Sequence, residues 1–187
     1  MILDFTYIAT FISLIYGLAL AHGLSCIAEL LQNYKKIKNY WVWWIWAAFL
    51  LLLSNGFWVS IYNIWHELEQ WKMAYVVFIT FEGCLFYLCY YIFFNHINEI
   101  EKKDLEYDYY KNKRFFFLIL SISIFCMLNL SEVIINEYTF IEKLKSQPPI
   151  VALTLIPLAF SENKKLHASI GLFNLSIFLI DIIFELV

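Results

Sequence analysis

The chain has 187 residues, of which 62% are hydrophobic, 20% aromatic and 16% charged, with a formal net charge of -3. Soluble globular domains are about 45–50% apolar and about 25% charged, and a chain of this size cannot hide such an apolar excess in one core. The composition therefore excludes an ordinary water-soluble protein and predicts an integral membrane protein. The nearly balanced charge gives no electrostatic basis for direct nucleic-acid binding.

Six apolar runs follow one another along the chain, and charged connections separate them. They cover Asp4–Gln32, Trp41–Trp65, Met73–Asn95, Phe115–Asn136, Pro149–Phe160 and Leu166–Val187. About 20 apolar residues cross the ~30 Å hydrocarbon core of a bilayer, so all but the fifth run are long enough to span it. The short fifth run contains Pro157 and is read as a kinked span, a re-entrant segment or an interfacial piece. We expect an all-α, polytopic transmembrane helix bundle of about six spans, forming a single domain over 1–187.

The first run also carries a ridge of small residues. Every fourth position is small, so these side chains lie along one face of a helix: Ser13, Gly17, Ala21 and Ser25. Such a ridge lets a second helix approach closely, and close packing drives helix association in lipid. The ridge therefore predicts a helix-packing surface and a homo-oligomer.

Basic residues indicate the orientation of the bundle. Ten of the 13 Lys and Arg residues lie in the connections after the first, third and fifth runs. Because basic loops stay in the cytoplasm, this bias predicts a multi-pass protein of the bacterial inner membrane with both termini outside. The longest connection, 98–114, then offers a cytoplasmic surface for a protein or nucleoprotein partner. Aromatic rings prefer the headgroup level, which predicts interfacial belts at Tyr40, Trp41, Trp43, Trp44, Trp46, Trp65 and Trp71.

Polar residues inside the runs fall into two layers. An outer layer holds Asn55, Glu82, Glu132 and Asp181, and an inner layer holds His22, His96 and His167. Asn174 lies seven residues from both His167 and Asp181, and therefore on their helix face. These residues either line a hydrated, cation-favouring cavity or pore, or join helices by hydrogen bonds. Packing alone hardly explains carboxyls at the depth of Glu82 and Asp181, because buried charge in lipid is costly.

The sequence lacks the catalytic motifs that would predict an enzyme. The pair His66-Glu67 is not followed by a second histidine at the zinc-protease spacing, and neither a nucleophile elbow nor a phosphate-binding glycine loop occurs. The four cysteines have no metal-binding spacing and are expected as core residues. We expect no metal and no cofactor. A haem or metal site on the inner histidines would need facing rings at one depth.

The segment DFTYIATFISLIYGLALAHGLSCIAELL, followed by YWVWWIW, resembles small polytopic bacterial membrane proteins of uncharacterised function. It is also similar to the membrane accessory proteins encoded beside type VI-B, RNA-targeting CRISPR effectors. The resemblance lies in size, multi-span layout and the first two helices, and supplies no catalytic residues. It implies an immunity-associated inner-membrane protein that acts on, or is controlled by, a cytoplasmic nucleoprotein complex.

Two functions of different classes follow from these features. The first is a non-enzymatic, self-associating membrane protein, pore-like or scaffolding, that serves as an effector or accessory of a bacterial anti-phage system. The second is a small proton- or cation-coupled transporter or channel that uses Glu82 and Asp181. Assembly that depends on the small-residue ridge would support the first function, and flux that depends on the carboxyl groups would support the second.

Overall fold

The computed structural model describes residues 5–66, 68, 70–94, 104–131, 134 and 147–186, without the side chains of 128–129, 147–149 and 181–186. In these residues every regular element is helical, which confirms the predicted all-α bundle. The long helices of this part are α1 (Phe5–Gln32), α2 (Trp41–Trp65), α3 (Met73–Phe93), α4 (Leu105–Phe125), α7 (Gln147–Phe160) and α8 (Lys164–Leu186). Two short segments join them, the 3₁₀-helix η1 (Tyr34–Lys36) and the π-helix η3 (Cys126–Leu130).

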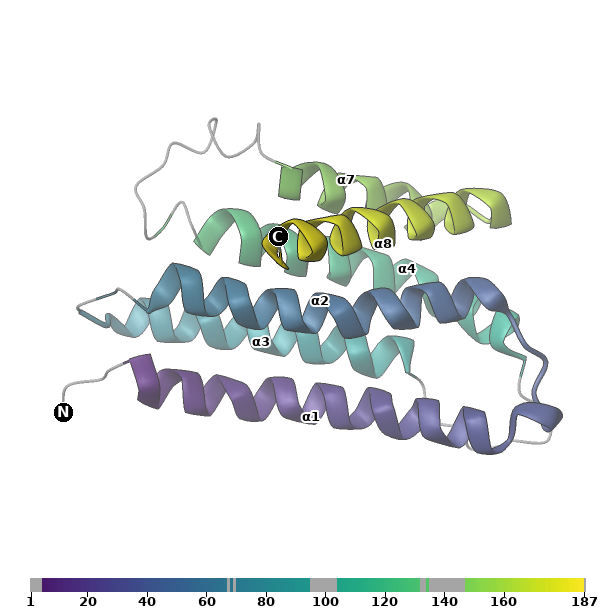
Figure 1. Ribbon diagram of the computed structural model, residues 1–187, viewed down its shortest axis with the longest axis horizontal. Coiled ribbons are helices and arrows are strands. Elements are labelled where there is room, and N and C mark those ends of the chain that lie inside the picture. Colours follow the sequence, from purple (N-terminus) through teal and green to yellow (C-terminus); the bar gives the residue numbers. More distant parts are fainter. Residues whose placement is uncertain are drawn as a thin grey trace.

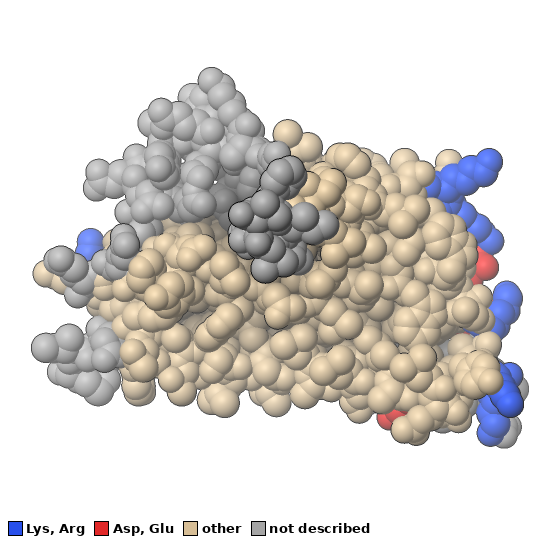
Figure 2. Space-filling view, viewed as in Figure 1, with Lys and Arg blue, Asp and Glu red and all other residues tan. Residues whose placement is uncertain are grey.

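The helices lie side by side and alternate in direction (Figure 1). Helices α1, α3 and α7 run one way along the long axis, and α2, α4 and α8 return. Helix α3 lies between α1 and α4, α4 also packs against α7, and α8 rests on α2. Most Lys and Arg residues in view gather at the end where α1 meets η1 and where α4 and α8 begin, which we call the lysine-rich end (Figure 2).

Three helices of the described part are long and apolar enough to cross a membrane, namely α1, α2 and α3. Helix α4 carries charged residues in its first turns. Helix α7 has only 14 residues, about 21 Å at 1.5 Å per residue, which is shorter than the hydrocarbon core. Pro157 lies inside α7 and has no N–H to donate to the preceding turn. The protein is therefore a helical membrane protein, and among its described residues three helices meet the full spanning length.

Aromatic side chains make most of the bundle core. Of the twelve largest fully buried side chains among the described residues, nine are aromatic. Trp43, Trp46 and Trp65 are at most 4% exposed and pack inside the bundle, so the expectation that they form interfacial belts is wrong for these three. Trp41, at 57% exposed, does face outward. Sequence alone could not separate the buried tryptophans from the exposed one. Helix α2 is apolar on all sides, so the spacing of its apolar residues does not indicate which face is buried.

Helix α4 begins at Leu105, ten residues before the predicted apolar run. The charged residues that we expected in a connection therefore form its first turns, and the rest of that connection lies outside the described residues. Asp104 explains the early start, since its Oδ1 accepts hydrogen bonds from the backbone N–H groups of Glu106 and Tyr107 at 3.0 and 3.2 Å. An aspartate at this position satisfies free N–H groups at a helix start.

Asp104 also ties α4 to the connection between α1 and α2. Its Oδ2 lies 2.7 Å from the Lys38 ammonium nitrogen, and the Leu105 N–H donates to the Lys38 carbonyl at 3.1 Å. The hydrogen bond from Lys38 is the main cause that lowers the pKa of Asp104 below its ordinary 3.8, and the same contact raises the pKa of Lys38. The ionised carboxylate is therefore part of the folded state.

We expect folding stability to fall on the acid side because of Asp104. A lowered folded-state pKa gives stability that is present above pH 3.8 and is lost as the pH falls through the folded-state value. Asp104→Asn keeps an oxygen acceptor for the cap and should cost under about 1 kcal/mol, with a weaker acid dependence. Asp104→Ala also loses the cap and should cost about 1 kcal/mol more. Thermal unfolding in detergent at several pH values measures both, and equal Tm values for the two variants would contradict the capping role.

Candidate functional site

A carboxyl group is buried in the middle of helix α3. Glu82 is 1% exposed and is the tenth of the 21 residues of the helix. Its Oε1 accepts a hydrogen bond of 2.6 Å from the Ser131 hydroxyl. Its Oε2 is buried and has no hydrogen-bond partner among the described residues. A carboxyl in such surroundings needs a proton, a cation or water to offset the loss of hydration.

The π-helix η3 sets the position of Ser131. In this segment the Ser131 N–H reaches the carbonyl of Cys126, five residues back. The Ser131 hydroxyl lies 3.3 Å from the same carbonyl, so it has two acceptors, Glu82 Oε1 and Cys126 O, for a single proton. Single π-helical turns are rare and occur frequently at functional sites. Here the turn brings a serine against the buried acid.

Tyr16 of α1 covers the same face of α3. Its ring stacks on Phe86 with 4.7 Å between centroids and lies 3.7 Å from the position that a Cβ on Gly83 would take. The Tyr16 hydroxyl is buried without a hydrogen-bond partner in the described part. Two groups with unused hydrogen-bonding capacity therefore lie against one stretch of α3. We call Tyr16, Glu82 and Ser131 the Glu82 site.

The other predicted outer-layer residues do not join this site. Asn55 is exposed and donates to the Leu51 carbonyl of its own helix at 3.0 Å. Asn174 is 2% exposed, and neither of its side-chain polar atoms has a described partner. Asp181 belongs to α8, but its side chain lies outside the described residues, as does all of Glu132. A pore lined jointly by these residues stays a prediction.

Two of the inner-layer histidines bind carbonyl groups at helix ends. His22 Nε2 lies 2.8 Å from the carbonyl of Phe94, at the end of α3, and Cys26 Sγ lies 3.3 Å from the same oxygen. His167 Nε2 lies 3.0 Å from the carbonyl of Ser161, just after α7. Because carbonyls only accept, each histidine is protonated at Nε2. The third histidine, His96, lies outside the described residues.

His167 is the centre of a fully partnered polar cluster at the lysine-rich end. The Tyr109 hydroxyl donates to His167 Nδ1 at 2.8 Å. Lys113 donates to the Ser161 carbonyl at 2.5 Å, and its ammonium nitrogen lies 5.1 Å from the Tyr110 ring centroid. Every group in this cluster has a partner, which is the arrangement expected of side chains that fix helix packing. Across the described ranges, no three His, Cys, Asp or Glu residues come together as metal ligands.

The small-residue ridge lies on the outer side of α1. Gly17, Ala21 and Ser25 are exposed and Ser13 is half-buried, and a Cβ on Gly17 would meet no atom within 4 Å. Helix α1 packs on α3 through another face, which includes Gly23. The Gly23 position is filled by rings, with Tyr90 Cε1 2.8 Å and Phe94 Cε2 3.0 Å from the place of a Cβ. The ridge is therefore exposed at Gly17, Ala21 and Ser25 in the described bundle.

Sequence reasoning singled out Glu82 but missed Ser131 and Tyr16. Depth within the third run identifies a buried acid, whereas no pattern in the sequence indicates the π-helical turn that aims Ser131 at it. Tyr16 lies seven residues before Gly23 and therefore on the same face of the helix. This spacing was the signal in the sequence that could have placed Tyr16 on the face that packs against α3. Comparison with protein-family models, with curated proteins and with solved structures gives no match.

We expect Gly23 and Gly17 to respond in opposite ways to alanine. Gly23→Ala pushes a methyl group into the Tyr90 ring, whose hydroxyl is anchored by Ser54 and the Leu50 carbonyl, and overpacking costs about 1–3 kcal/mol. Gly17→Ala meets open space and gains helix propensity of about 1 kcal/mol. Thermal unfolding in detergent should therefore give a lower Tm for the first variant only. A lower Tm for Gly17→Ala would show that this face is packed.

Proposed function

We propose that this chain is a small, non-enzymatic, proton-coupled membrane carrier in which Glu82 takes up and releases the proton. The single observation that carries the proposal is the buried Glu82 carboxyl, with one oxygen bound to a serine that has a second acceptor and the other oxygen unpartnered in the described residues. Intramembrane acids of this kind mark proton and ion pathways in transport proteins.

The hydrogen bonds of the Glu82 site suit both protonation states. In the ionised state, the Ser131 hydroxyl donates to Glu82 Oε1 across 2.6 Å. When a proton is on Oε1, Glu82 donates to Ser131 Oγ, and the serine hydrogen turns to the Cys126 carbonyl at 3.3 Å. One hydroxyl rotation therefore accompanies the gain of one proton, and the serine keeps an acceptor in each state.

The charge distribution supports a cytoplasmic location for the lysine-rich end. In inner-membrane proteins Lys and Arg remain on the cytoplasmic side, and the described basic residues concentrate at the end where α4 and α8 begin (Figure 2). With six crossings, this orientation leaves both termini on the extracytoplasmic side of the inner membrane. The Glu82 site then lies about midway between the two faces, at the centre of α3, where alternating access from either side is needed.

Glu82→Gln tests the proposal. Glutamine keeps the shape and an acceptor for Ser131 but cannot exchange a proton. We expect proton flux into liposomes, driven by a membrane potential and read with an internal pH dye, to fall to the level of protein-free vesicles. The carboxylic-acid C=O band in the infrared should also be lost. The matched control is Glu162→Gln, which removes an equal charge from a 90% exposed side chain at the lysine-rich end.

The two variants separate the outcomes. Wild-type flux that survives Glu82→Gln rejects the role of this acid. Flux that is lost equally in Glu162→Gln points to a general effect of charge at the membrane surface. Absence of proton flux from the wild-type protein, with correct insertion verified, rejects a carrier.

A second candidate is a self-associating scaffold or pore-like effector in bacterial immunity, as the sequence resemblance implies. The observation that favours it is the outward position of the small-residue ridge, where a Cβ on Gly17 would meet no atom of another helix within 4 Å. A ridge that is not used inside the bundle is available to a second copy. In this function the cytoplasmic start of α4 would be the docking surface for a protein or nucleoprotein partner.

Gly17→Leu tests assembly without disturbing the bundle. The leucine enters open space in the single chain but blocks close approach of a second α1. We expect a drop in mass, measured in mild detergent by light scattering, with an unchanged Tm. An unchanged mass, or a monomeric wild-type protein, contradicts this candidate.

A further inference from the structure

An apolar groove lies at the lysine-rich end, between the connection from α1 to α2 and the start of α4. Its volume is about 360 Å³, within the range of about 300–1,000 Å³ typical of small-molecule sites. It is lined by Leu30, Leu31, Tyr34, Ile37, Asn39, Trp44 and Leu105. The groove is separate from the Glu82 site and has no part in the function proposed above.

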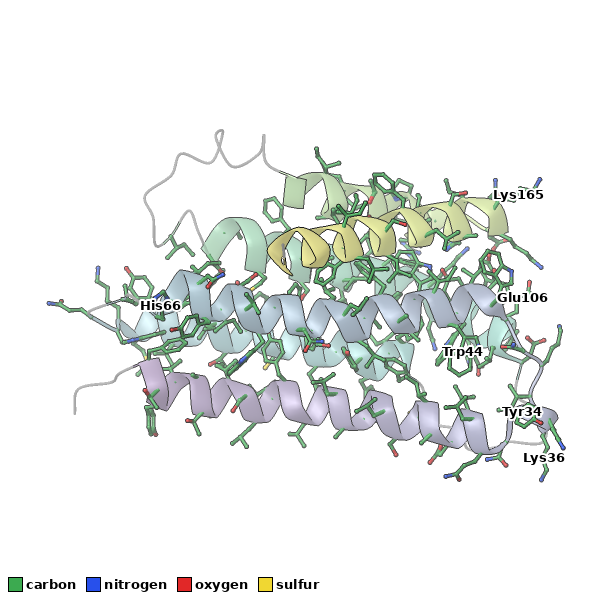
Figure 3. All side chains as sticks on the ribbon, viewed as in Figure 1. Tyr34, Lys36, Trp44, His66, Glu106 and Lys165 are labelled. Atoms are coloured by element: carbon green, nitrogen blue, oxygen red, sulfur yellow. The ribbon has the colours of Figure 1, made fainter. Side chains whose placement is uncertain are left out.

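The groove has a closed floor and open walls. Leu30 and Leu105 are at most 3% exposed and form the floor, whereas Leu31 and Tyr34 are 58% and 65% exposed at the rim. The Trp44 indole N–H donates to Asn39 Oδ1 at 2.7 Å, which fixes the ring in the wall. Leu30 and Leu31 belong to the last turn of α1 and Trp44 to the first turn of α2, so the groove lies at the lysine-rich end, where Figure 3 shows Tyr34 and Trp44.

Exposed lysines lie beside the groove. The acids nearest to the groove on α4 are already paired, Asp104 with Lys38 and Glu106 with Lys164. Glu29 on α1 and Asp108 on α4 are further acids of this end among the described residues. Lys35 and Lys36 of η1 are exposed, and neither forms an ion pair within the described residues. The Lys35 ammonium nitrogen lies 5.8 Å from the ring centroid of Tyr34, a lining residue, and Lys36 follows it in η1. An apolar groove with exposed lysines beside it matches a molecule with an anionic head and a hydrocarbon body.

We propose that this groove binds an anionic phospholipid of the adjoining leaflet. The upper hydrocarbon segment lies against Leu30 and Leu105, the rings of Tyr34 and Trp44 lie beside the glycerol region, and the phosphate is held by Lys35 and Lys36. Aromatic rings of this kind favour the headgroup level, and basic pockets between helices on the cytoplasmic side bind anionic headgroups. A zwitterionic lipid fits less well because its own cation repels the two lysines.

Native mass spectrometry tests the site with the full chain released from nanodiscs of phosphatidylcholine and phosphatidylglycerol. We expect phosphatidylglycerol to be retained in preference to phosphatidylcholine. Lys35→Gln with Lys36→Gln should lower its relative retention by about fivefold for each lysine. The matched control is Lys111→Gln with Lys165→Gln, which removes two charges from exposed positions on α4 and α8 at the same end. The control should retain the lipid as the wild type does.

Three results would overturn the proposal: equal retention of the two lipids, equal losses in the two double variants, or displacement of phosphatidylglycerol by inorganic phosphate. The last would assign the lysines to a soluble anion. Quenching by phosphatidylglycerol brominated near its headgroup locates the lipid, because Trp44→Phe should remove part of the quenched fluorescence. Unchanged quenching in that variant would place the lipid elsewhere and also overturn the proposal.

Discussion

Every polar side chain that enters this bundle must find its partner within the protein, because neither lipid nor an aromatic core offers a hydrogen bond. Most described groups meet this requirement. The hydroxyl of Tyr90 binds Ser54 and a backbone carbonyl, and the cluster around His167 closes completely. The described side chains that do not are Glu82 at Oε2, the Tyr16 and Ser123 hydroxyls, the Asn174 amide and the indole N–H groups of Trp46, Trp65 and Trp71. Glu82 is the one carboxyl in this set, and burial costs most for a group that can carry a full charge.

The positions of the helices along the chain could largely be predicted from the sequence. The face that each helix turns toward the core could not. The apolar runs predicted both ends of α2 and the end of α1 because hydrocarbon thickness sets how long such a run must be. The start of α4 was missed because Asp104 caps it within a charged segment. A pattern of apolar residues cannot predict a helix start in such a segment. The burial of Trp46 and the outward face of Gly17 were also inaccessible. Helices that are apolar all round carry no periodic signal for their inner side.

The candidate site was predictable only for the residue that is expensive to bury. Glu82 stands out at once in an apolar run, since a carboxyl at that depth requires a reason. Asn55 occupies a comparable depth, yet its amide is satisfied by its own helix and faces outward. Serine is a common residue in such helices, and whether Ser131 contacts the acid depends on the direction in which its side chain points. The residue type alone therefore predicted Glu82, whereas only the three-dimensional structure revealed its partner Ser131.

The π-helical turn has a consequence for how this chain tolerates change. Closing a turn over five residues instead of four rotates all that follows by roughly 100° relative to a straight helix. If the same residues wound as a regular α-helix, Ser131 would turn away from Glu82. Loss of one residue within Cys126–Leu130 lets an α-helical turn replace the π-helical turn, and the serine then keeps its face toward the acid. Single-residue deletions in this stretch should therefore be tolerated better than deletions between it and the start of α4, which rotate the residues on one side of the deletion relative to those on the other.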